Sequence, residues 1–501
     1  MENQTDKRAA GILCHISSLN GKYGIGSLGK EAYNFVDFLE RAHAKYWQIL
    51  PLAQTGFGDS PYQSVCAGSG NPYFIDLEIL RDKGLLTDDE LLKAEVEGEK
   101  VDYAQLYIDR YKLLRTAFSR FDIESPDFVA FIESGKFEDY ALFMSLKTKY
   151  SCTFDNFPEE YKCKRQPALG EFRASVYSTE YCFWLFLQYE FLNQWSALKS
   201  YANQKGIKII GDIPLYVAYD SADVWGRPDI FQLDEELKPT RVAGVPPDYF
   251  SKTGQLWGNP LYNWNTLKAQ GYEWWVERIK NARELYDVIR IDHFRGLDRY
   301  YSIPVEAETS EIGEWCEGPK TELFNAIKSR LGEVEIIAED LGVLDDGVIN
   351  LREDTGYPGM KILMFAFDGE GDNDYLPERI EENSVTYTGT HDNDTTLGFL
   401  DKMTEEEFSA FKTRLRASMK KLGLNLPFTT RSQTAYALAV TALATKSTLA
   451  VIPIQDLLLL NTYARMNTPS TRSDNWQFRL KETPGRYFAA IMRKAVKFFN
   501  R

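Results

Sequence analysis

Eight short apolar segments, separated by longer amphipathic stretches, constrain the fold of this 501-residue chain more than any other feature. Strand-like segments that alternate with helical stretches are typical of parallel sheets built from βα units. The segments comprise residues 11–18, 46–52, 207–217, 287–294, 334–340, 360–367, 385–392 and 449–456. Eight units close a barrel. The sequence therefore predicts an α/β fold, a (β/α)8 TIM barrel.

Two of the connections are too long for one crossover helix, and both predict insertions. Residues 56–206 are charged and helical in character, which favours an inserted, mainly helical subdomain. Residues 219–270 are rich in Pro, Gly, Tyr and Trp and predict a second insertion, with a lid loop over the active site. Length alone is equally compatible with three ordinary domains. The eight recurring units favour one catalytic barrel over residues 1–501.

The charge balance disfavours some partners. The chain holds 73 acidic and 58 basic residues, a formal net charge of −15, with both signs interspersed. This excess of negative charge repels a phosphate backbone or an anionic lipid surface. The first residues lack a long apolar stretch before a cleavage site, and no later segment stays apolar for the ~18 residues that a membrane helix needs. We expect a cytoplasmic protein that contacts neither nucleic acid nor membrane.

The six cysteines are scattered, and no two of them form a CxxC pair. This spacing indicates reduced, structurally ordinary thiols rather than a disulfide framework, a redox motif or a zinc site. With four histidines in the chain, a metal site has little support, and we expect neither metal nor cofactor. The aromatic content of 14% would supply flat faces for a sugar-binding cleft, although most of the rings belong to the core.

Charged residues gather at the ends of the apolar segments, where barrel enzymes place their chemistry. In residues 287–294, Val288, Arg290 and Asp292 lie two residues apart and so share one face of a strand. Arg290 is expected to keep Asp292 ionised well below neutral pH, as a nucleophilic carboxylate requires. Taken alone, such a pair is more often a structural ion pair.

Two further segment ends supply carboxylates. Glu339 is expected to face the barrel mouth, whereas the adjacent Asp340 points the other way. The same alternation, continued along residues 385–392, directs Asp392 to the mouth. A partly desolvated glutamate beside two aspartate anions is the group most easily kept protonated, which a general acid needs. A nucleophile and an acid roughly 5–5.5 Å apart perform retaining glycoside chemistry. The joint pattern, rather than any single residue, carries this prediction.

Several motifs resemble a known family. Those that resemble the four signature segments of the α-amylase superfamily, in order, are GDIPLYV (211–217), RIDHFRG (290–296), AEDLG (338–342) and GTHDND (389–394). Those that resemble the amylomaltase, or 4-α-glucanotransferase, family in particular are GDSPYQ (58–63), SGNPYFIDLE (69–78), AGVPPDYFSKTGQLWGNPLYNW (243–264), GYPGMKILMFAF (356–367), ARMNTPST (464–471) and NW (475–476). The resemblance extends from about residue 11 to residue 479.

The resemblance implies residue roles. Asp292 would be the nucleophile, Glu339 the general acid/base, and Asp392 the carboxylate that holds and distorts the sugar next to the scissile bond. The substrate-binding residues would be Arg290, which also orients the nucleophile, Asp212, His391, Tyr62, Trp257, Ser60 and Asn393. Tyr62 and Trp257 would be stacking platforms, although core packing is a rival explanation for Trp257. Residues 246–249 would cover the acceptor side, and the motif of Asn467 and Pro469 could be structural only.

The implied function is transfer of α-1,4-glucan segments between maltooligosaccharides or maltodextrins by a retaining double displacement. An α-amylase-type hydrolase would share all three acids and is the nearest alternative. A non-catalytic maltodextrin-binding protein would need the aromatic platforms but not the acids, and a metal-dependent sugar isomerase is a weaker option. The sequence leaves open the chain lengths of donor and acceptor, the ratio of transfer to hydrolysis, the formation of large cyclic glucans and the oligomeric state.

Overall fold

The computed structural model describes residues 8–56, 58–96, 98–175, 178–247, 252–342, 344–369, 373–471 and 473–501. Its centre is a closed barrel in which each strand pairs in parallel with the next along the chain, and the last strand pairs with the first. The barrel strands are β1 (Ala9–Leu13), β2 (Tyr46–Gln48), β3 (Lys208–Ile213), β6 (Val288–Ile291), β9 (Ile336–Ala338), β10 (Gly359–Ile362), β11 (Ser384–Tyr387) and β12 (Leu449–Pro453). Each strand lies in or overlaps one of the eight predicted segments, so the predicted (β/α)8 fold is confirmed.

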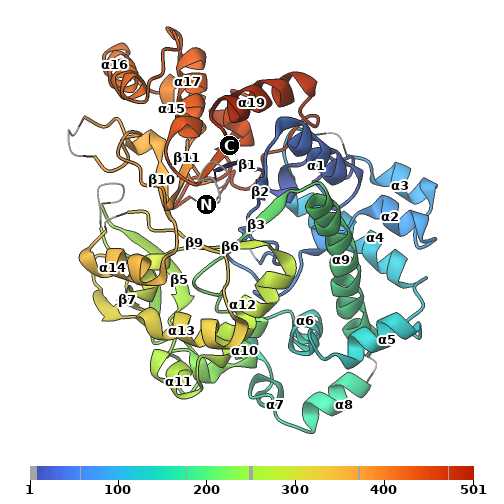
Figure 1. Ribbon diagram of the computed structural model, residues 1–501. Coiled ribbons are helices and arrows are strands. Elements are labelled where there is room, and N and C mark those ends of the chain that lie inside the picture. Colours follow the sequence, from blue (N-terminus) through green and yellow to red (C-terminus); the bar gives the residue numbers. More distant parts are fainter. Residues whose placement is uncertain are drawn as a thin grey trace.

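Helices surround the barrel (Figure 1). Those between successive barrel strands include α1 (Lys30–Ala42), α9 (Ser178–Gln204), α12 (Glu273–Leu285), α13 (Lys320–Leu331), α14 (Asp346–Thr355), α15 (Thr396–Asp401), α16 (Glu405–Lys421) and α17 (Arg431–Ala444). After β12 come α18 (Ile454–Leu457) and α19 (Arg486–Phe498), and α19 packs against both α1 and α17. Capping boxes at Thr87 and Thr404 start α3 (Asp88–Ala94) and α16.

The stretch between β2 and β3 is mainly helical, and its helices gather on one side of the barrel (Figure 1). They are α2 (Leu77–Asp82), α3, α4 (Tyr103–Phe118), α5 (Pro126–Glu133), α6 (Glu138–Tyr150), α7 (Glu159–Lys162) and α8 (Ala168–Ala174). The long helix α9 contacts α4, α5, α6 and α8 as well as α1 and β3, and so joins this stretch to the barrel. That residues 56–206 form a separate subdomain stays a prediction.

A second sheet, which the sequence reasoning did not predict, lies beside the barrel. Its four antiparallel strands run in the order β5 (Gln255–Pro260), β4 (Arg241–Val245), β7 (Arg299–Pro304) and β8 (Glu314–Glu317). The sheet therefore joins the stretch between β3 and β6, which also contains α10 (Ala222–Gly226) and α11 (Trp264–Ala269), to the segment that follows β6. Two strands of the stretch 219–270 share this sheet with residues 299–317, and the prediction that the stretch is an insertion with a lid loop stays a prediction.

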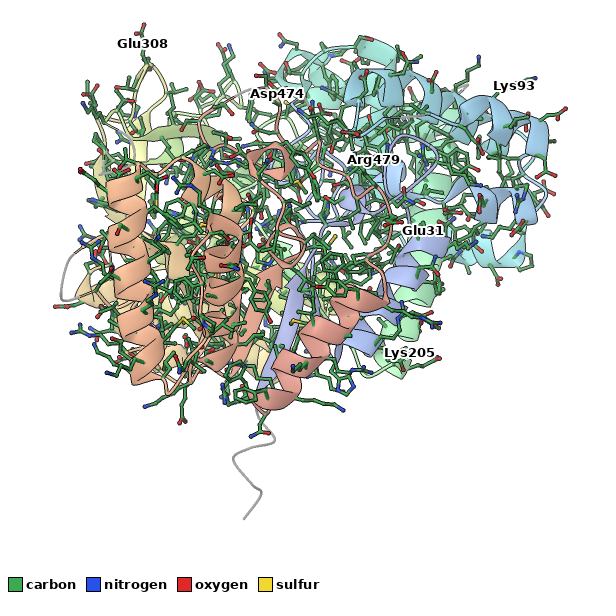
Figure 2. The ribbon with its side chains drawn as sticks, turned by 90° about the horizontal axis from the view of Figure 1, so that it is seen from above. Glu31, Lys93, Lys205, Glu308, Asp474 and Arg479 are labelled. Atoms are coloured by element: carbon green, nitrogen blue, oxygen red, sulfur yellow. The ribbon has the colours of Figure 1, made fainter. Side chains whose placement is uncertain are left out.

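The loops after the barrel strands gather at one end of the molecule. In Figure 2, Lys205, just before β3, lies toward the lower edge, whereas Glu308 and Asp474, in segments that follow β6 and β12, lie toward the upper edge. All six cysteines are free, as their spacing predicts. Among the described residues, no helix has both the length and the apolar character needed to cross a membrane.

Candidate active site

The three predicted acids follow three different barrel strands. Asp292 comes directly after β6 and Glu339 directly after β9, where backbone hydrogen bonds to the neighbouring strands continue. The amide of Asp292 donates to the carbonyl of Ile213 at 3.0 Å, and that of Glu339 to the carbonyl of Ile291 at 3.1 Å. Both carboxyl groups are therefore presented from fixed backbone at the same end of neighbouring strands.

Arg290 connects the nucleophile candidate to a buried partner. Its Nη1 donates to both carboxylate oxygens of Asp212, at 2.8 and 2.7 Å, and to Oδ1 of Asp292 at 2.9 Å. The side chains of Arg290 and Asp212 are 4% and 0% exposed, whereas that of Asp292 keeps 29% of its surface. Asp212 thus holds the Arg290 guanidinium from its buried side. Of Arg290, Asp212 and Asp292, Asp292 is the residue exposed enough to reach a ligand.

Burial outweighs the cation in setting the proton affinity of Asp292. Desolvation raises its pKa from 3.8 to about 6, and the opposing charge of Arg290 compensates only in part. The expectation that Arg290 keeps this carboxyl ionised well below neutral pH is therefore corrected. Loss of surrounding water destabilises the Asp292 anion more than the Arg290 guanidinium stabilises it. Asp292 is still mostly deprotonated at pH 7.

Glu339 lies against the backbone that follows Asp292. Its carboxylate accepts the amide of His293 at 2.6 Å and that of Leu341 at 3.1 Å. Burial raises its pKa from 4.5 to about 8; Arg290 opposes that shift, and the nearby Asp292 anion adds to it. Glu339 thus carries a proton at neutral pH while Asp292 beside it does not, as an acid and a nucleophile require.

Asp392 is the most open of the three acids, with 46% of its side chain exposed. The strand alternation from which its direction was predicted does not hold, because β11 ends at Tyr387 and the loop then turns. Asn393 closes that turn: its side-chain oxygen accepts the amide of Thr390 at 2.8 Å and the Thr390 hydroxyl at 3.1 Å. Asp392 nevertheless lies near the other acids, since its charge contributes to the raised pKa of Asp292.

Tyr62 and His391 pack together beside these carboxylates. The Tyr62 hydroxyl donates to Oδ2 of Asp212 at 2.8 Å, and the two rings stack with centroids 5.1 Å apart and planes 15° apart. His391 Nε2 lies 3.4 Å from Oδ1 of Asp392. Because Arg290 and Tyr62 occupy the buried Asp212 carboxylate, a contact between Asp212 and a sugar hydroxyl stays a prediction.

The remaining predicted residues lie in the surrounding loops. Trp257, in β5, is half-buried and meets the His293 ring edge-on at 4.7 Å, so it takes part in packing while part of its surface stays open. The Ser60 hydroxyl accepts the amide of Tyr62 at 3.3 Å within a tight turn. Of the predicted cover over the acceptor side, Asp248 and Tyr249 lie outside the described residues. Substrate contacts by Trp257, Ser60 and Asn393 stay predictions.

The sequence reasoning missed how much of the site the C-terminal segment builds. Asn467 Nδ2 donates to Oδ1 of Asp392 at 2.6 Å, so its motif does more than shape a loop. The ring of Trp476 packs against both Tyr62 and His391, at 5.8 and 5.9 Å between centroids. The ARMNTPST (464–471) and NW (475–476) motifs were the available signals, but nothing in them indicated these partners. Among the described residues, no group of three or more His, Cys, Asp or Glu side chains is placed to hold a metal ion.

Comparison with known proteins assigns the family. The model of the family described as 4-alpha-glucanotransferase matches residues 14–483. The chain belongs to this 4-alpha-glucanotransferase family. A relative from Clostridium butyricum named 4-alpha-glucanotransferase is 45% identical over 475 residues, covering 93% of this chain and 95% of the relative. One of the same name from Thermus thermophilus is 44% identical over 483 residues, covering 94% and 95%.

Solved structures agree with the family assignment. The amylomaltase from Streptococcus agalactiae, determined in complex with acarbose, matches with a TM-score of 0.92 and 38% identity over 99% of both chains. The amylomaltase from Corynebacterium glutamicum matches with a TM-score of 0.80 over 99% of this chain and 76% of that chain. At 18% identity, this second likeness concerns the fold alone. The resemblance to the amylomaltase family that the motifs indicated is confirmed.

Proposed function

We propose that this 4-alpha-glucanotransferase family member transfers α-1,4-glucan segments between maltooligosaccharides or maltodextrins by a retaining double displacement. The observation that carries the proposal is the placement of two carboxyl groups at the ends of neighbouring strands: Arg290 holds Asp292, and Glu339 accepts the amide of the residue that follows Asp292. Asp292, with a pKa of about 6, is ionised at neutral pH, and Glu339, with a pKa of about 8, is protonated there. The Glu339 carboxylate accepts the amide of the residue that follows Asp292, which holds the two side by side.

In the first step, Glu339 donates its proton to the glycosidic oxygen while Asp292 attacks the anomeric carbon. The bond between that carbon and the glycosidic oxygen breaks, an ester to Asp292 forms, and the reducing-end fragment leaves with the proton. Arg290 holds one oxygen of Asp292 at 2.9 Å, so the attacking group cannot swing away.

In the second step, Glu339 acts as the base. It removes the proton from the 4-hydroxyl of an incoming glucan, whose oxygen attacks the anomeric carbon as the ester to Asp292 breaks, and a new α-1,4 bond forms. Asp392 holds and distorts the sugar next to the scissile bond. His391 Nε2 lies 3.4 Å from Oδ1 of Asp392, where it can bind a further hydroxyl of that sugar. Water in place of the glucan would give hydrolysis, so transfer depends on excluding water from the ester.

Support for a glucan ligand comes from the aromatic surroundings of the acids. The rings of Tyr62 and Trp257 are half-buried; Tyr62 packs against His391, and Trp257 packs against His293. Such rings offer flat apolar faces to sugars, while carboxylates and histidines bind the hydroxyl groups. The proposal includes a cytoplasmic setting and neutral glucans, rather than nucleic acid or membrane, as the partners of this acidic chain.

The test of the reaction is the product profile from maltotriose. A transferase produces glucose together with maltopentaose and longer chains, whereas an α-amylase-type hydrolase produces only shorter sugars. We expect longer products to dominate early in the reaction, measured by chromatography of samples taken before equilibrium. Glucose and maltose alone would refute transfer.

The nucleophile is tested by Asp292→Asn, which removes the attacking anion but keeps the shape of the side chain. We expect turnover to fall by about 10⁴-fold or more, while maltooligosaccharide binding remains measurable by calorimetry. The matched control is Asp287→Asn. Asp287 lies at the other end of β6, where it binds the Asn203 amide at 2.9 Å and the Ile209 amide at 2.7 Å. Wild-type turnover in Asp292→Asn would defeat the assignment.

A further inference from the structure

Residues 465–467 lie against the loop that carries the third acid and donate three hydrogen bonds to it. Arg465 Nη2 donates to the backbone carbonyl of Asp392 at 2.7 Å, and its Nε donates to the carbonyl of Asn467 at 2.7 Å. The amide of Asn467 donates to the carbonyl of His391 at 3.1 Å, and its side chain donates to Oδ1 of Asp392 at 2.6 Å. Backbone and carboxylate of the same residue are thus held by one short segment.

This segment is itself anchored. The amide of Trp476 donates to the carbonyl of Met466 at 2.7 Å, and the Trp476 ring packs against Tyr62 and His391. Trp476 has a φ of 64°, an unusual left-handed conformation for a large aromatic residue, which the surrounding contacts must maintain. The position of Asn467 is therefore set by the packing of the active-site rings rather than by the loop alone.

Asp392 needs such support more than its two partners do. Asp292 is held by Arg290, and Glu339 by two backbone amides. Asp392 lies in a turn beyond the end of its strand with 46% of its side chain exposed. Within the described part of the chain, the Asn467 side chain donates to Oδ1 of Asp392 at 2.6 Å, and His391 Nε2 lies 3.4 Å from the same oxygen. Without the bond from Asn467, the longer contact with His391 would be left to oppose rotation of the carboxylate toward solvent.

We propose that Asn467 and Arg465 are positioning residues for the transfer reaction, and that they act by holding Asp392 in the orientation that grips the sugar. The inference rests on the proposed function, because the orientation of Asp392 matters for the reaction only if Asp392 acts on the glucan. Arg465 fixes the peptide of Asp392 and Asn467 fixes its side chain. A carboxylate displaced by about 1 Å can lower a rate by about 100-fold.

The primary test is Asn467→Ala, assayed for kcat and KM with maltotriose. We expect kcat to fall about 10- to 100-fold with a change in KM of less than about 3-fold, because the lost alignment acts on distortion of the sugar rather than on overall binding. Arg465→Met is expected to lower kcat in the same way, and Arg465→Lys, which keeps one donor, to recover part of the loss. A kcat within 2-fold of wild type in Asn467→Ala would overturn the inference.

A double-mutant cycle distinguishes positioning from general loosening. If Asn467 acts through Asp392, then adding Asn467→Ala to Asp392→Asn lowers the residual rate by less than about 3-fold, since the group to be positioned is already disabled. The same 10- to 100-fold loss in both backgrounds would overturn the inference. Should Asn467→Ala fail to fold, Asn467→Ser enters the same cycle in its place.

Asn203→Ala is the matched control. The Asn203 amide also donates to an aspartate, Asp287 Oδ2 at 2.9 Å, and to the carbonyl of Ile207 at 3.0 Å, but at the opposite end of the barrel. It is expected to keep wild-type kcat. The two proposals also fail separately: full activity in Asp392→Asn would refute the role given to Asp392, whereas an impaired Asp392→Asn together with an unimpaired Asn467→Ala refutes positioning alone.

Discussion

The proton affinities of Asp292 and Glu339 make the pH profile a test at the scale of single residues. Burial raises the pKa of Asp292 to about 6 and that of Glu339 to about 8. The reaction needs the first group deprotonated and the second protonated. We therefore expect kcat/KM to rise with pH through about 6, to reach its maximum near neutral pH, and to fall again above about 8.

The two limbs can be separated by Glu339→Gln with a donor whose leaving group needs no proton, such as a fluoride. The alkaline limb should then disappear while the acidic limb of Asp292 stays. An acidic limb near pH 4 in the wild-type protein would mean that Arg290, rather than burial, dominates the environment of Asp292.

Residue identities could be predicted where strand geometry applies and not beyond it. Asp292 and Glu339 directly follow their strands, so alternation and segment ends were sufficient to single them out. Asp392 was found by its motif, because its loop turns after β11. Its hydrogen bond to Asn467 joins two residues far apart in the chain and depends on the rotamer of the Asn467 side chain. No local sequence pattern specifies such a contact.

At the scale of elements, the sheet beside the barrel fixes the ends of the loop between β4 and β5. The Ser310 hydroxyl, fully buried, lies 2.6 Å from the carbonyl of Val245 and 2.8 Å from that of Thr253. The amide of Ser310 donates to Thr253 as well, at 3.2 Å. Ser310 thus ties together the last residue of β4 and a residue just before β5.

Ser310→Ala tests whether this loop limits the access of water to the ester. Loss of the hydroxyl removes its contacts with both ends of the loop and leaves the backbone amide bond to Thr253, so we expect the hydrolysed fraction of maltotriose to rise about 2- to 10-fold while total turnover changes less. Ser302→Ala is the control, since Ser302 is equally buried in the same sheet but contacts Arg241 instead. An unchanged ratio of hydrolysis to transfer would exclude a role for these ends.

The elements themselves were predictable to different degrees. All eight barrel strands could be located, because each lies in or overlaps a short, mostly apolar segment, and most of its residues are buried. The second sheet was not, because its short strands pair residues 241–245 with residues 299–304 across β6, and such non-local pairing leaves no periodic signal. The predicted insertion 219–270 holds two of the four strands of this sheet.

At the scale of the whole molecule, closure of the barrel depends on the two ends of the described chain. β1 pairs with β12 from Ala9 with Leu449 to Leu13 with Pro453. This closure followed from counting eight βα units. The side chains that secure the closure could not be predicted in this way, because they bind backbone carbonyls, and every residue has one.

Arg501 is the clearest of these closing side chains. Its Nε donates to the carbonyl of Leu443 at 2.7 Å, and its Nη2 to that of Thr445 at 2.8 Å. Its Nη1 donates to the carbonyl of Ala9 in β1 at 3.0 Å. One guanidinium thereby joins the first barrel strand to the segment that leads into the last one.

Arg501→Met should therefore destabilise the fold without touching the chemistry. Three backbone carbonyls lose a charged donor, and we expect the free energy of unfolding to fall by roughly 2–3 kcal/mol. The melting temperature should decrease, while kcat/KM of the folded fraction stays within 2-fold of wild type, because the acids lie at the opposite end of the strands. Arg493→Met, on the exposed face of α19, controls for the loss of one positive charge. Equal melting temperatures for Arg501→Met and the wild type would show that strand pairing alone closes the barrel.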